Sequence, residues 1–220
     1  MGVLRPGFSC LIVFIGITLS ISGTLLATNS LVLWFFLVLG SLSSCGWLQP
    51  KISSCSLVLY FVISVLGGLL FLLSCGNYSF AAVLMQVSLL LKLGLAPFQF
   101  WVYPVIQNLV VTEACFFLGP LKFGLLWLLV GLGPISILLC SLSFFIGLTI
   151  LWLASRLHLV LYASGALQVL VLVVLGPSHF FFYFLIYLLA LLGVSWTSTG
   201  LVSPFLAFLG LASVPPLTMF

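Results

Sequence analysis

The sequence predicts an all-α membrane protein, a polytopic bundle of about eight or nine transmembrane helices. Of its 220 residues, 65% are hydrophobic and only 3% are charged, whereas an ordinary soluble domain carries about 25% charged residues. So few charges cannot cover a water-soluble surface, and the composition excludes soluble globular proteins, nucleic-acid binders and disordered tails. The apolar residues form long runs, and glycine and proline lie between most of them.

The length of these runs sets the number of helices. A helix needs about 20 apolar residues to cross a hydrocarbon core of about 30 Å, so 220 residues with short joins give about eight or nine spans. A strand of a transmembrane β-barrel would alternate apolar and polar residues, and the run at 180–192 does not alternate. We therefore expect helices at residues 8–26, 31–48, 56–73, 80–97, 114–132, 135–154, 157–175 and 180–196, with a shorter one at 201–214.

Turn-forming residues separate the expected helices. Glycine and proline do not easily continue a helix, and breakers occur at 49–51, 76–77, 133–134, 176–178 and 199–200. The short joins leave no room for a soluble domain, so we expect a single transmembrane domain over residues 1–220. Arg5 before the first run also fits a secretory signal, but the runs behind it favour a retained first span.

Three basic residues in the expected loops predict the orientation. Arg5 precedes the first span, Lys51 lies between the second and third, and Arg156 lies between the sixth and seventh. An even number of spans separates each pair, so all three fall on one side of the membrane. The positive-inside tendency assigns that side to the electrically negative compartment.

Lys92 and Lys122 are the two basic residues inside apolar runs. A lysine near the bilayer centre costs about 2.5–3.5 kcal/mol on insertion scales, so each one calls for a compensating partner or a function. The alternative is that each side chain extends along its four-carbon stem to the membrane interface. We favour an ion or proton pathway, because intramembrane charges usually mark such pathways.

Both lysines lie beside a residue that interrupts helices. Pro97 follows Lys92 by five residues, and Pro120 precedes Lys122 by two. Proline removes a helical hydrogen bond, and broken helices in membranes are tolerated where they line a cavity or pack against protein. We therefore expect a broken helix near Pro97 and a second break at Pro120. A desolvated lysine beside exposed backbone and water can exchange a proton near neutral pH.

The other ionisable residues leave alternatives open. Glu113, the only acid, precedes Lys122 by nine residues, about 13 Å along a helix, so a direct salt bridge would need a bend at Pro120. Glu113 is either a partner of the lysines through water or an interfacial acid near a helix N-terminus. His158 is either a proton acceptor at the mouth of a pathway or an ordinary interfacial histidine. Tyr162 belongs to a water path or is an interhelical hydrogen bonder.

The cysteines show no metal-binding pattern. All six are scattered through apolar runs without a CxxC pair, and cysteine is at home in an apolar interior. We therefore expect neither a metal site nor a bound cofactor in this chain.

The segment KLGLAPFQFWV at 92–102 resembles the KLGLAPFHFWVPEV region of the mitochondrial NADH dehydrogenase subunit 2 family, an antiporter-like membrane subunit of respiratory complex I. Three further segments follow in the family's order. Lys122 falls near the spacing of the family's second membrane lysine, and RLHLVLYASG at 156–165 is similar to the family's LRKILAYSS. LGLASVPPLTMF at 209–220 is similar to LGGLPPLTGF, so the resemblance covers about residues 80–220.

The resemblance implies a non-redox, proton-translocating subunit of complex I, the H+-translocating NADH:ubiquinone oxidoreductase, in the mitochondrial inner membrane. It implies no complete active site in this chain. Quinone reduction elsewhere in the complex would change the proton affinity at Lys92 and Lys122. The implied partners are lipid and the other membrane-arm subunits of the complex.

The sequence also departs from the family. Gln99 stands where the family commonly has histidine, and residues 31–40 lack the glutamate that the family carries in an earlier helix. That role is lost, is supplied by Glu113, or comes from another chain. The similarity ends at the PPLT-like motif, so we expect the front portion of such a subunit, with its remaining helices in a second polypeptide or absent.

Three other functions remain as alternatives. A structural membrane-arm subunit that has lost proton translocation would need no acid. Another antiporter-like cation/proton subunit would use intramembrane lysines in the same way. An independent small-molecule transporter would show an inverted repeat, and the flanks of Lys92 and Lys122 do not match.

Overall fold

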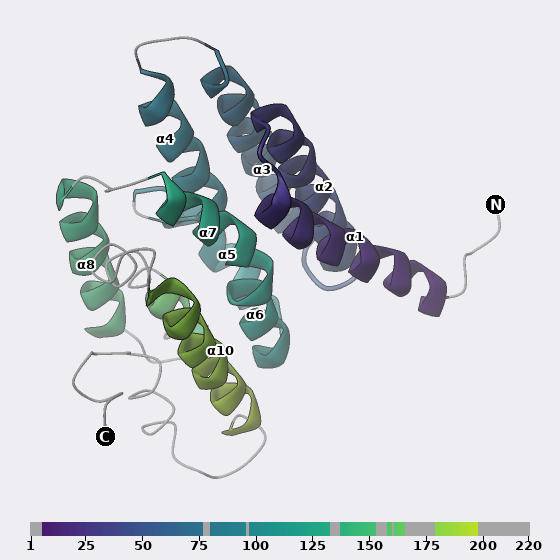
Figure 1. The fold of residues 1–220 in the computed structure, drawn as a ribbon. Coiled ribbons are helices and arrows are strands. Elements are labelled where there is room, and N and C mark those ends of the chain that lie inside the picture. The colour runs from purple at the N-terminus through teal and green to yellow at the C-terminus, as the bar shows by residue number, and fades with distance from the viewer. Residues whose placement is uncertain are drawn as a thin grey trace. The chain divides into compact units, whose positions relative to one another are not determined.

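The computed structural model describes residues 6–76, 80–95, 97–132, 137–152, 158–159, 161–165 and 179–197. All regular secondary structure in these residues is helical, so the all-α prediction is confirmed for them. Two one-turn 3-10 helices, η1 (Gln99–Trp101) and η2 (Pro120–Lys122), interrupt the chain. The α-helices, labelled in Figure 1, are α1 (Pro6–Leu26), α2 (Ser30–Leu48), α3 (Ser54–Ser74), α4 (Ala81–Leu93), α5 (Val102–Gln107), α6 (Val111–Leu118), α7 (Phe123–Gly131), α8 (Ile137–Trp152) and α10 (Phe180–Thr197).

Several described helices match the dimensions of a membrane. Three segments are long and apolar enough to cross one: Ser30–Leu48, Ser54–Ser74 and Val111–Gly131, the last taken through its break. Shorter apolar helical segments occur at Leu11–Leu26, Ala81–Leu93 and Phe180–Gly193. These lengths are consistent with the membrane protein that the composition predicts.

Local capping places the helix starts where the apolar runs begin. The side chain of Asn29 accepts a hydrogen bond of 3.0 Å from the backbone N–H of Leu31 at the start of α2. At the start of α3, the Ser53 hydroxyl oxygen accepts a 3.4 Å hydrogen bond from the backbone N–H of Ser56. Such N-caps satisfy backbone donors that have no partner within the helix.

The loop between α2 and α3 holds Lys51, as predicted. Its Nζ lies 3.9 Å from the ring centroid of Trp47, a cation–π contact at the end of α2. The other two orientation residues, Arg5 and Arg156, lie outside the described residues, as do most of the expected helix at 157–175 and all of that at 201–214.

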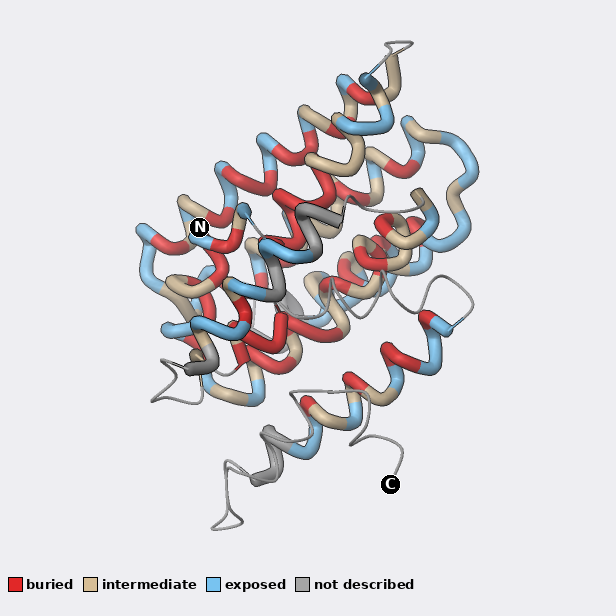
Figure 2. Tube along the Cα trace, turned by 90° about the vertical axis from the view of Figure 1, so that its left-hand side faces the viewer, coloured by how far each residue is buried: buried red, intermediate tan, exposed pale blue. Residues whose placement is uncertain are grey.

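The chain divides into two compact units. The first comprises Met1–Leu93 and Phe123–Leu132, and the second comprises Gly94–Lys122 and Gly133–Phe220. In the first unit, α2 packs between α1 and α3, α4 packs on α3, and α7 contacts α1 and α4. Figure 2 shows buried positions recurring along one side of the helices, while exposed positions line the other. The expected single domain over residues 1–220 stays a prediction.

Small residues bring α1 and α2 close together in the first unit. A Cβ built on Gly16 would meet Oγ of Ser43, and one built on Gly40 would meet Oγ of Ser20. The Ser20 hydroxyl donates a 2.8 Å hydrogen bond to the backbone carbonyl of Phe36 in α2. Close backbone approach and interhelical hydrogen bonds of this kind hold helices together in lipid, where apolar burial contributes little.

This packing predicts the effect of one methyl group. Gly40→Ala should displace the Ser20 hydroxyl. We therefore expect the free energy of unfolding of the Gly40→Ala chain to be about 1–2 kcal/mol lower than that of the Gly131→Ala chain. Gly131 is the matched control, because a Cβ there meets no atom of the described residues within 4 Å. Detergent titration of the purified chain, followed by circular dichroism, measures the difference. Equal stabilities for the two variants would contradict the packing.

In the second unit, α10 packs on α6. Phe184, Tyr187 and Leu191 of α10 are buried, and a Cβ built on Gly119 after α6 would lie 3.0 Å from Leu191. The opposite side of α10 exposes further large apolar residues: Phe181, Phe182, Leu185, Leu189 and Leu192. A helix that is apolar all round belongs inside a large core or a membrane.

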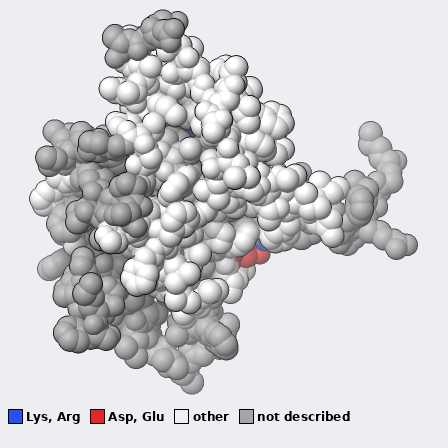
Figure 3. Space-filling model, viewed as in Figure 1, with Lys and Arg blue, Asp and Glu red and all other residues white. Residues whose placement is uncertain are grey.

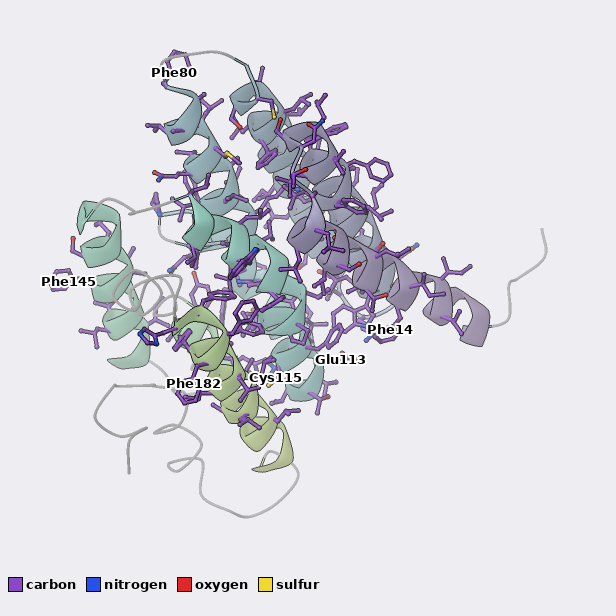
Figure 4. All side chains as sticks on the ribbon, viewed as in Figure 1. Phe14, Phe80, Glu113, Cys115, Phe145 and Phe182 are labelled. Carbon is purple, nitrogen blue, oxygen red and sulfur yellow. The ribbon has the colours of Figure 1, made fainter. Side chains whose placement is uncertain are left out.

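Exposed apolar side chains occur in both units. Figure 4 shows Phe80, Phe145 and Phe182 projecting away from the ribbon, and their exposed fractions are 56%, 64% and 70%. Figure 3 shows a described surface on which nearly all atoms belong to uncharged residues. The surface therefore suits contact with lipid or with other apolar chains.

The fourth expected span is shorter than its apolar run. The run extends to residue 97, but α4 ends at Leu93, because Gly94 takes a left-handed conformation with φ of +64°. A short helix, α5, then occupies part of the connection for which the apolar runs predict no helix. Its apolar positions Val102, Val105 and Ile106 are buried and share one helical face.

Candidate functional site

Lys92 lies in the last turn of α4, inside the first unit, with only 7% of its surface exposed. Its Nζ donates a 3.0 Å hydrogen bond to Oγ of Ser41 and a 3.4 Å one to the backbone carbonyl of Leu37. Both acceptors belong to α2, and both are uncharged. The side chain therefore points into the helix bundle of its unit rather than out to an interface.

Two glycines of α3 make room for the lysine stem. A Cβ built on Gly67 would lie 2.6 Å from Cγ of Lys92, and one on Gly68 would lie 3.8 Å from Nζ. Any larger residue at Gly67 would overlap the lysine stem and force it to move. The backbone oxygen of Ser88, 3.3 Å from the built Cβ, limits the space on the same side. Gly67 is therefore a positioning residue for Lys92.

Hydrogen bonds fix the acceptors around the Lys92 ammonium. Nε1 of Trp34 donates a 3.0 Å bond to the backbone carbonyl of Gly68, which ties α2 to α3. The Ser41 hydroxyl donates a 2.7 Å bond to the carbonyl of Leu37 while it accepts the bond from Lys92. The serine lone pairs thus face the lysine, since its only proton is used within α2. Sequence reasoning missed Ser41, whose only signal was a hydroxyl within the second apolar run.

Lys122 lies in the second unit, at the end of η2, and is 5% exposed. Pro120 begins η2, so the predicted helix break at this proline is present between α6 and α7. Nζ of Lys122 lies 6.0 Å from the ring centroid of Phe117, within the range of a cation–π contact. Lys122 is therefore buried, as its place in an apolar run predicted.

The break near Pro97 connects to this second lysine through aromatic rings. Gly94 packs under Trp101, since a Cβ built on it would lie 2.9 Å from the indole and would also meet Val102. Trp101 is 1% exposed, and its ring meets Phe117 edge-on at 6.3 Å between centroids. A packed series from Gly94 through Trp101 and Phe117 thus ends at the Lys122 ammonium.

His158 and Tyr162 fasten a further helical segment to η1 and α5. Nε2 of His158 lies 2.9 Å from the backbone oxygen of Leu109, and because a carbonyl only accepts, this nitrogen carries the proton. The Tyr162 hydroxyl donates a 3.0 Å bond to the backbone oxygen of Gln99. Its ring also lies 5.6 Å from that of Tyr103. Tyr162 is thus an interhelical hydrogen bonder, one of the two alternatives expected.

Glu113 lies in the first turn of α6. Its Oε2 accepts a 3.4 Å hydrogen bond from the backbone N–H of Val110. This contact suits the interfacial acid near a helix N-terminus, because the helix dipole favours a negative charge there. A role for Glu113 as partner of the two lysines stays a prediction.

The described residues give no sign of a metal site. They contain no group of three or more His, Cys, Asp or Glu residues that could hold a metal ion. Cys45, Cys55, Cys75 and Cys115 are free thiols.

Comparisons with known proteins do not assign a family. A scan of known protein families finds no match to the sequence, and a search of curated proteins finds no similar chain.

Proposed function

We propose that this chain is a proton-translocating, non-redox membrane-arm subunit of respiratory complex I. The observation that carries the proposal is Lys92, an amine buried in an apolar helix bundle beside a helix break. An intramembrane ionisable residue of this kind is by default a functional group, because burying it only for stability is costly. The motif at 92–102 supplies the family resemblance.

The contacts of Lys92 suit a group that gains and loses a proton. Among the described residues, its two hydrogen-bond acceptors are a hydroxyl and a carbonyl, and neither is a carboxylate. Within the described part of the chain, no ion pair therefore holds the amine in its charged form. A change of field from neighbouring subunits could move the equilibrium between the ammonium and the neutral amine. Lys122 is the second proton-carrying group, and His158 accepts protons at the mouth of the path.

The proposal includes the remaining expectations of the resemblance. The chain itself forms a polytopic bundle of about eight or nine spans in the mitochondrial inner membrane. Its partners are lipid and the other membrane-arm subunits. It carries no cofactor, and the redox chemistry of the complex takes place elsewhere.

A structural role is the second candidate function. The position of Glu113 at the α6 N-terminus favours it, because the only acidic side chain in the sequence already accepts a local hydrogen bond. In that role, the chain fills the membrane arm and binds its neighbours without moving protons.

Replacing Lys92 tests these two functions against each other. In the assembled complex in sealed vesicles, we expect Lys92→Met to abolish proton translocation while assembly is retained. Methionine keeps the length and apolar character of the stem and removes the ionisable nitrogen. Proton uptake is followed with a pH-sensitive dye during NADH oxidation, and assembly by native gel electrophoresis.

Lys51→Met is the matched control, because Lys51 lies in the loop between α2 and α3 and contacts Trp47. We expect it to translocate protons as the unmodified complex does. Normal translocation by an intact Lys92→Met complex would overturn the proposal and leave the structural role.

A further inference from the structure

The side-chain amide of Gln99 is buried and has no hydrogen-bond partner among the described residues. Gln99 is 4% exposed, and neither its Nε2 nor its Oε1 bonds to any other residue of the described chain. Its backbone oxygen, in contrast, accepts bonds from Val102 N–H and from the Tyr162 hydroxyl. The unsatisfied group is therefore the amide alone, in the second unit, at the helix break.

A buried amide without a partner is unfavourable, because it loses its bonds to water and gains none in return. Native proteins satisfy most such groups, and an ordered internal water is a common partner. The amide offers two N–H donors and one acceptor oxygen. Its ligand must therefore both accept and donate, which water does and a simple anion or cation does not.

We propose that Gln99 forms a binding site for an internal water molecule beside Tyr162 in the second unit. The Tyr162 hydroxyl uses its proton on the Gln99 backbone and keeps lone pairs that can accept from the water. Trp101 belongs to the same one-turn helix as Gln99, and the Tyr162 ring packs against that of Tyr103. The site rests on the geometry of Gln99 and holds whether or not the chain moves protons.

Hydroxyl-radical footprinting tests the site in the full chain embedded in lipid nanodiscs. X-ray irradiation generates radicals from bound water where it lies, so buried residues beside it are oxidised. Trp101 is the reporter, because it is 1% exposed and lies two residues from Gln99 in the same short helix. After correction for intrinsic reactivity, we expect Trp101 to be oxidised well above Phe71, which is 0% exposed.

The variant Gln99→Met removes both amide atoms at nearly constant length. We expect it to lower the oxidation of Trp101 to the level of Phe71. Gln107→Met is the matched control, since Gln107 is an exposed residue at the end of α5, and it should leave Trp101 oxidation unchanged. Oxidation of Trp101 in the unmodified chain no higher than that of Phe71 would overturn the site, and this measurement needs no variant.

Thermal stability gives an independent test. If water satisfies the amide, Gln99→Met loses hydrogen bonds and should lower the melting temperature relative to Gln107→Met. If the amide has no ligand, the same change removes an unfavourable buried group and should raise the melting temperature. A rise would therefore contradict the water site.

Discussion

Gly94→Ala is expected to destabilise the folded chain by about 2–5 kcal/mol. Gly94 has φ of +64°, a conformation in which a Cβ crowds the following carbonyl oxygen. The added methyl group would also collide with Val102 and approach the Trp101 indole to 2.9 Å. Backbone strain and overpacking therefore act at the same position, and neither can relax without moving the buried tryptophan.

Detergent titration of the purified chain, followed by circular dichroism, measures this loss. Gly193→Ala is the control, because Gly193 lies in α10 and a Cβ there would meet nothing within 4 Å in the part of the chain that the structure describes. Alanine favours a helix more than glycine does, so the control should be unchanged or slightly more stable. An equally stable Gly94→Ala chain would show that the α4 end does not adopt this conformation.

Ser41→Ala is expected to cost about 1.5–3 kcal/mol in the free energy of unfolding when Lys92 is charged. The variant removes the nearer acceptor of the ammonium, at 3.0 Å, and leaves the carbonyl of Leu37 at 3.4 Å. A buried charge that loses a hydrogen bond has no water to replace it. The loss should therefore depend on Lys92 itself.

A double-mutant cycle isolates that dependence. In a Lys92→Met background, Ser41→Ala should cost much less than in the unmodified chain. Ser22→Ala is the control, because Ser22 is exposed and its hydroxyl donates to the Leu19 carbonyl of its own helix. Its effect should be the same in both backgrounds. If Ser41→Ala also costs the same in both, Ser41 does not hold the lysine.

The helices of the first unit can be predicted from the sequence because their signal is local. The expected runs at 31–48 and 56–73 agree closely with α2 (Ser30–Leu48) and α3 (Ser54–Ser74). In lipid every backbone polar group must be satisfied internally, so a long apolar run has few alternatives to a helix. The breaks near Pro97 and at Pro120 are likewise indicated by the residues themselves.

The short helix α5 cannot be predicted in the same way. A helix of six residues is not stable alone, and its formation depends on the packing of Val102, Val105 and Ile106 in the second unit. Apolar runs of membrane length carry no signal for so short a segment. Tertiary contacts therefore decide it.

The residues of the candidate site can likewise be predicted only in part from the sequence. A charge within an apolar run is visible in the sequence, so the sequence alone singles out Lys92 and Lys122. It does not reveal the partners of Lys92, because Leu37 and Ser41 lie 55 and 51 residues from it along the chain. Only the packing of α2, α3 and α4 brings these oxygens to the ammonium, and only the burial of Gln99 leaves its amide in need of a ligand. The apolar composition thus predicted a lipid environment and long helices. Hydrogen bonding between distant segments was decided only by the tertiary structure, because it depends on which helix faces meet.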